Sequence, residues 1–224
     1  MLRHAAQSLI DHAARHGLRR LSSVRVVRSC ADRELAQPLA FLSVQGWPQS
    51  QLADWEDWAT RFSKEGYSSL LLNLDPAAAL NNSDSSSALL AELEREMVRL
   101  LRDPANSSPF PPLLFASQAS SLVAETYVSS HPLSGLCLVE PTPAPVAHEQ
   151  LPSVFSSLVD DFNYEPGFPI AVVGAERSTD RQEHRLLKEF EEEDGEGLVQ
   201  RVVWGSNATH GWSRLRDWMD ENGF

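Results

Sequence analysis

Short, almost continuously apolar segments constrain the fold of this chain more than any other feature. They occur at Leu39–Val44, Leu113–Ala116, Leu136–Val139 and Pro169–Gly174. Each is as long as a β-strand, and turn-forming residues bound them. Strands that are apolar at nearly every position must be covered on both faces, which is typical of an open parallel sheet. The pattern therefore predicts buried parallel strands.

Amphipathic segments separate these strands. Apolar residues at helical spacing predict helices over residues 52–65, 89–101, 122–131 and 212–219, a charged helix over 181–193, and a short helix around 154–160. Two further strands are expected at 67–74 and 198–204. Alternation of strands and helices from residue 39 onward predicts an α/β fold, a three-layer α/β/α sandwich with a mostly parallel sheet. Ligands of such sheets bind at the carboxyl ends of the strands.

The segment from Leu113 to Pro132 resembles the strand, elbow and helix of the α/β-hydrolase family. Aligning Ser120-Ser-Leu-Val-Ala with the start of the family's helix puts Gln118 at the position of the nucleophilic serine. A carboxamide is not a useful nucleophile, since acyl-enzyme chemistry needs an activated hydroxyl or thiol. A register shifted by one residue makes Ser117 the nucleophile instead. This alternative puts Phe115 where the sharp turn normally has a small side chain.

The resemblance also implies where the other catalytic groups lie. The acid position after the strand at 170–174 is Arg177, so Glu176 and, at the end of the preceding strand, Glu140 are the candidate acids. His210 falls where the family keeps its general base. The resemblance further implies an oxyanion loop with backbone N–H groups from Gln45, Gly46, Trp47 and Ala119. The connection from Glu140 to Phe168 leaves room for a minimal cap or none.

The first 30 residues differ from the rest in charge. They contain six arginines and one acid, a net charge of +5, whereas the whole chain of 224 residues has a net charge of −12. An Arg-rich, acid-poor, amphipathic N-terminus is typical of a mitochondrial transit peptide. We therefore expect residues 1–30 to be a transit peptide or, as the alternative, a basic amphipathic helix that stays on the domain. A hydrolase-like domain is expected over 38–224, with mitochondrial localisation, or a cytoplasmic location as the alternative.

Several function classes are excluded. The acidic remainder of the chain argues against nucleic-acid binding, and no apolar run is long enough for a transmembrane span. Nucleotide fingerprints are absent, and Cys30 and Cys137 have no metal-binding spacing, so neither cofactor nor metal is expected. The leading interpretation is a non-catalytic protein that binds a small acyl-type ligand or a protein partner. The alternative is a small serine esterase or thioesterase that uses Ser117, His210 and Glu176 or Glu140.

Overall fold

The computed structural model describes residues 22–174, 184–192, 197–205 and 208–224. It contains one seven-stranded sheet with the strand order β1-β3-β2-β4-β5-β6-β7. The strands are β1 (Ser23–Val27), β2 (Leu39–Val44), β3 (Ser69–Leu74), β4 (Leu113–Ser117), β5 (Gly135–Val139), β6 (Ile170–Gly174) and β7 (Val199–Val203). Strand β1 is antiparallel to β3, and all other neighbours are parallel. The predicted mostly parallel sheet is confirmed.

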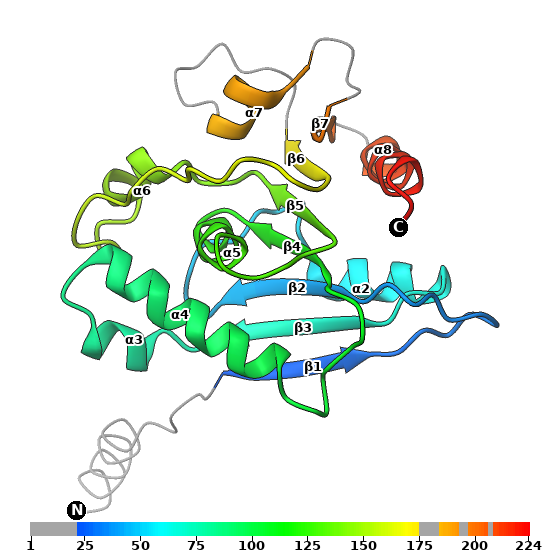
Figure 1. Ribbon diagram of the computed structural model, residues 1–224, viewed down its shortest axis with the longest axis horizontal. Helices are drawn as coiled ribbons and strands as arrows, with labels where there is room; N and C mark the ends of the chain where they lie inside the picture. Colours follow the sequence, from blue (N-terminus) through cyan, green and yellow to red (C-terminus); the bar gives the residue numbers. More distant parts are fainter. Residues whose placement is uncertain (1–21, 175–183, 193–196, 206–207) are drawn as a thin grey trace, which may run out of the picture.

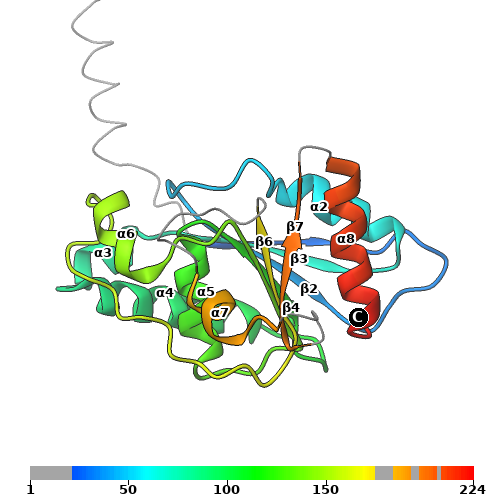
Figure 2. The ribbon, with the colours of Figure 1, turned by 90° about the horizontal axis from the view of Figure 1, so that it is seen from above.

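Helices cover both faces of this sheet (Figures 1 and 2). One face carries α2 (Trp55–Lys64) and α8 (Ala208–Glu221). The other carries α4 (Ser86–Leu101), α5 (Ser120–Val128), α6 (Ala144–Gln150) and α7 (Arg185–Phe190), with α3 (Ala77–Asn82) packed on α4. Within the described ranges, every helix is too short or too polar to cross a bilayer. The predicted three-layer sandwich is thus confirmed.

Alternation along each strand explains why the strands read as unbroken apolar runs. Leu114 and Ala116 of β4 face the core beneath α4 and α5, whereas Leu113 and Phe115 face the core beneath α2 and α8. Because successive side chains point to opposite faces, a strand buried on both sides needs apolar residues at every position. Aromatic rings fill the core beneath α2 and α8. There the ring of Phe115 stacks on that of Phe41 in β2, with a distance of 4.7 Å between the ring centroids.

The structure departs from the sequence prediction at the amino-terminal edge. Strand β1 lies inside the segment assigned to the leader, and all five of its residues pair with β3. Arg25 of β1 also forms an ion pair with Glu56 of α2. The sheet therefore begins at Ser23, ahead of the predicted domain start at residue 38. Its alternating Ser-Val-Arg-Val-Val sequence is typical of an edge strand with one polar side.

Several predicted helix boundaries were also wrong. The short helix expected around 154–160 lies instead at α6, where Pro145 occupies the first turn, a position that proline favours. Helix α3 was not predicted; it begins with the three alanines that follow Pro76, and alanine is the strongest helix former. Helix α7 starts only at Arg185; residues 181–183 of the helix predicted there lie outside the described residues. Helix α8 starts four residues earlier than predicted.

Candidate functional site

Gln118 forms the tight turn between β4 and α5, at the carboxyl end of the central strands. It has a φ of +48°, a left-handed conformation that is rare for a residue with a side chain. Its N–H donates to the Val139 carbonyl at 3.1 Å, and its own carbonyl accepts from the N–H of Thr142 at 3.2 Å. The Ser121 hydroxyl donates to the same carbonyl at 2.6 Å. The neighbouring strand end and the first turn of α5 thus hold this strained turn in place.

Ser117, the alternative nucleophile, is the last residue of β4 and is fully buried. Strand alternation puts its side chain on the same face as Phe115, toward α2 and α8. Its hydroxyl has no hydrogen-bond partner among the described residues. A serine nucleophile needs a base within hydrogen-bond reach and access to the substrate. The described part of the chain gives Ser117 neither.

Glu140 follows β5 in a second left-handed conformation, with a φ of +45°. Its N–H donates to the Val173 carbonyl at 2.7 Å. Its carboxylate accepts a hydrogen bond of 2.6 Å from the hydroxyl of Ser50, a buried residue on the loop after β2. Ser50 also accepts from the Leu52 N–H at 3.0 Å. In this arrangement Glu140 joins the carboxyl ends of two strands.

The remaining triad candidates are not assembled in the described residues. His210 was expected in the loop after the last strand, but it lies in the first turn of α8 with an exposed side chain. Helix α8 begins early because Gly211 allows the backbone to pack against the Trp204 ring, where a Cβ atom would lie 2.4 Å from the nearest ring atom. Glu176 and Arg177 lie outside the described residues.

Two N–H groups of the expected oxyanion loop donate to carbonyl groups at the ends of β3 and β2. The Gln45 N–H donates to the Leu74 carbonyl at 2.9 Å, and the Trp47 N–H donates to the Val44 carbonyl at 3.1 Å. Gly46 adopts the positive φ of +77° that this turn requires. Two of the N–H groups assigned to this role are therefore already hydrogen-bonded. Ala119 directly precedes α5, at a helix start where N–H groups lack helical acceptors.

The indole of Trp47 is buried and packs edge-on against Phe155 at 5.4 Å. Phe155 belongs to the connection between β5 and β6, for which the sequence predicted a minimal cap or none. The connection contributes Phe155, Val159 and Phe162 to the core that lies beneath α4 and α5. The predicted minimal cap is thus a short packed segment.

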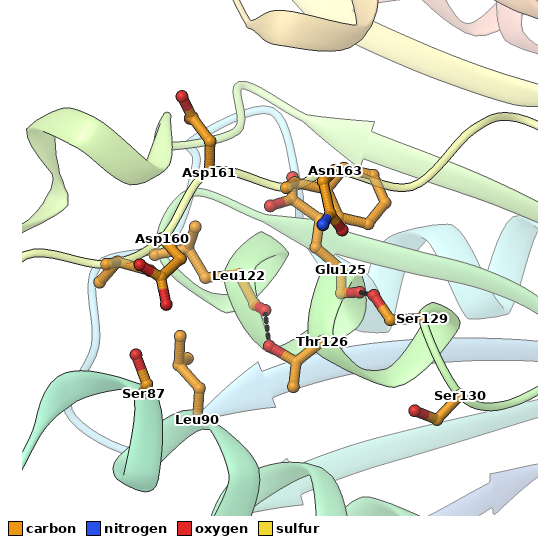
Figure 3. A pocket seen from close by; sticks show the side chains of 12 residues that line it. Ser87, Leu90, Leu122, Glu125, Thr126, Ser129, Ser130, Asp160, Asp161 and Asn163 are labelled. Carbon is orange, nitrogen blue, oxygen red and sulfur yellow. Dashed lines mark hydrogen bonds between the residues drawn. The ribbon is translucent and has the colours of Figure 1, made fainter.

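A hollow of about 270 Å³ lies between α4, α5 and this connection (Figure 3). Three of its polar side chains form hydrogen bonds within the protein. The Thr126 and Ser129 hydroxyls donate to carbonyls of their own helix, at 2.8 and 2.9 Å. The Glu125 carboxylate accepts from His184 Nε2 at 2.8 Å, and both side chains are buried.

The contacts of His184 fix its tautomer. Its Nδ1 accepts from the N–H of Leu186 at 3.4 Å, so the proton resides on Nε2, which donates to Glu125. Both ring nitrogens are engaged, and the pair joins the start of α7 to the middle of α5. The sequence analysis missed this pair, as it missed Ser50. The sequence offered one indication of the pair: Glu125 is the only charged residue among the apolar residues of α5, and a buried carboxylate needs a partner.

Sequence comparison identifies no relatives: no family model matches this chain, and no curated protein matches it. Solved structures do resemble it. The native esterase Est2 from Thermogutta terrifontis superposes with a TM-score of 0.59 at 12% identity, covering 91% of this chain and 88% of the esterase. MGS-MChE2, an α/β hydrolase from the metagenome of lagoon sediments at Mar Chica, Morocco, gives 0.57 at 8% identity, covering 91% and 96%.

An α/β serine hydrolase homologue from Coxiella burnetii gives a TM-score of 0.51 at 11% identity, with 89% of both chains covered. At these identities the likeness concerns the fold alone. Together with the seven-stranded, mostly parallel sheet, it shows that this protein has the α/β-hydrolase fold.

Proposed function

We propose that this chain is a non-catalytic α/β-hydrolase-like protein that works as a binding or assembly component. The observation that carries the proposal is Gln118 at the strained turn between β4 and α5. The family places its nucleophile on this kind of turn, where the side chain projects above the sheet. A glutamine there donates and accepts hydrogen bonds but forms no acyl-enzyme, which favours binding over turnover.

Two further observations support the proposal. The neighbouring Ser117 hydroxyl is buried, and among the described residues it has no hydrogen-bond partner that could serve as a base. The N–H groups of Gln45 and Trp47 donate to carbonyls of the protein, so that loop has lost two candidate donors to a developing oxyanion. Triad members act as a unit, and the loss of one lowers the rate by orders of magnitude.

A fluorophosphonate probe tests the proposal directly, because it reacts only with activated hydroxyl groups. The full chain is incubated with the probe, and peptides are mapped by mass spectrometry beside an active serine esterase as positive control. We expect no labelled serine in a sample whose folding is verified by circular dichroism. Labelling at Ser117 that Ser117→Ala abolishes would establish the esterase instead.

We also propose that the basic segment of residues 1–30 directs the protein to mitochondria, although its residues 23–27 belong to the sheet as β1. Their charge of +5 and amphipathic pattern support this proposal. The test is a fluorescent reporter fused behind these residues and followed in living cells. A version with all six arginines changed to glutamine is the control. Import that depends on the arginines is the expected result, and a cytoplasmic signal from the unaltered fusion would overturn it.

A further inference from the structure

The hollow between α4, α5 and the β5–β6 connection, which we call the α4–α5 hollow, has charged groups of one sign in its walls (Figure 3). Glu125 of α5 lines it, as do Asp160 and Asp161 of the connection. No lysine, arginine or histidine among the described residues lines it. Asp160 and Asp161 are exposed and form no ion pair within the described part of the chain. A hollow lined by one sign of charge concentrates ligands of the opposite sign.

Glu125 carries a buried charge that the fold satisfies only in part. Its side chain is 4% exposed, and its Oε1 accepts from His184 Nε2. Its second oxygen, Oε2, accepts no hydrogen bond from a described residue and is not sealed from the hollow. His184 does not cancel the charge, because its Nδ1 accepts from the Leu186 N–H and the ring is therefore neutral. Buried charges in proteins are normally paired, so Oε2 lacks a cationic donor.

Arg185, at the start of α7, does not supply this donor. Its guanidinium donates to the carbonyls of Phe162 and Tyr164, at 2.5 and 3.4 Å. It also forms an ion pair with Glu189 at 2.6 Å. The charge of Arg185 is thus matched by a carboxylate of its own helix, and the charge of Glu125 stays uncompensated among the described residues.

Two hydroxyl groups of the hollow offer only acceptors to a ligand. Thr126 and Ser129 donate their hydrogens to carbonyls of α5, which leaves their oxygen lone pairs free. In Figure 3 the Asp160 carboxylate points toward Ser87 at one end of the hollow, whereas Asp161 points away. A primary ammonium group, with three donors and no acceptor, complements this set. A metal ion fits less well, because no group of three or more His, Cys, Asp or Glu side chains among the described residues could hold one.

We propose that the α4–α5 hollow binds a small aliphatic ammonium ion. The ammonium group donates to Glu125 Oε2, and the Asp160 carboxylate attracts the cation. The alkyl chain leaves water and contacts the apolar walls, to which Leu90, Leu122 and Val159 contribute. A volume of about 270 Å³ lies just below the range for drug-sized ligands and suits a short amine. Gln118 does not line this hollow, so the site stands independently of the proposed function.

Isothermal titration of the full chain with hexylamine tests the proposal at about pH 7, where the amine is protonated. Hexan-1-ol and hexanoate serve as ligands of the same length, and we expect hexylammonium to bind at least about tenfold more tightly than either. Glu125→Gln should weaken hexylammonium binding about tenfold, equivalent to one charge-assisted contact. This variant should stay folded, because the amide oxygen can still accept from His184. Asp160→Asn, at an exposed position, should weaken binding several-fold.

Matched controls separate this site from general charge effects. Asp84→Asn removes the same charge from an exposed residue just before α4 that does not line the hollow. Glu94→Gln changes the carboxylate that pairs with His131, also outside the hollow. Both variants should bind hexylammonium as the unaltered protein does. The proposal is overturned if hexylammonium produces no heat at millimolar concentration, if hexan-1-ol or hexanoate binds equally well, or if Asp160→Asn and Asp84→Asn have equal effects.

Discussion

Replacing His184 with leucine should destabilise the protein strongly. The side chains of His184 and Glu125 are only 6% and 4% exposed, and they meet at 2.8 Å. The variant His184→Leu leaves the Glu125 carboxylate buried without its donor, a change that typically costs about 3–5 kcal/mol. For a chain of this size each kcal/mol corresponds to about 2–4 °C in Tm. The free energy of unfolding should therefore fall by about 3 kcal/mol, and Tm by roughly 6–12 °C.

Urea unfolding followed by circular dichroism measures this change. The matched control is His131→Leu, which breaks a 3.0 Å pair with Glu94 whose side chains are 18% and 14% exposed. Its loss should be smaller, because water solvates the remaining carboxylate. The double variant Glu125→Leu/His184→Leu should recover most of the stability, since no buried charge is left. A loss below about 1 kcal/mol for His184→Leu would refute the reasoning, since breaking a buried pair costs several times more.

Three further predictions follow from burial, close approach and strand pairing. Burial raises the pKa of the Cys137 thiol far above its usual range, so only the exposed Cys30 should react with a thiol reagent between pH 7 and 9. Gly211→Ala should cost about 1–3 kcal/mol in urea unfolding, because its Cβ would overlap the Trp204 ring. Removing residues 1–30 should cost roughly 2–3 kcal/mol, because half-buried valines of β1 are lost and β3 becomes an edge.

Each of these measurements has a control. Denaturant should expose the second thiol, and reaction of both thiols in the folded protein would contradict the burial of Cys137. Gly174→Ala has open space around its Cβ and should change stability by less than about 1 kcal/mol. Removing residues 1–21 leaves β1 intact and should preserve the unfolding midpoint. Equal midpoints for both truncations would show that β1 adds nothing to stability.

The fold could be predicted from sequence wherever a strand is buried on both faces. Residues 113–116 and 136–139 carry an unbroken apolar pattern that only a covered parallel strand satisfies, and both lie at the centre of the sheet. Strand β1 was not predicted, because its alternation of polar and apolar residues does not distinguish it from the basic segment that precedes it. Helix α6 was not predicted either, because Pro145 in its first turn, and not a helical spacing of apolar residues, marks where it begins.

The sequence by itself determined that, when Ser120 is aligned with the start of the family's helix, the nucleophile position holds Gln118, which has no hydroxyl group. Only the tertiary structure decided the backbone conformation there, since a φ of +48° results from bonds to Val139 and Thr142, which come from another strand end. It also decided the partners of Glu140 and Glu125, namely Ser50 and His184, which lie 90 and 59 positions away. Local patterns report burial and turns, but long-range hydrogen bonds form only when the sheet brings distant loops together.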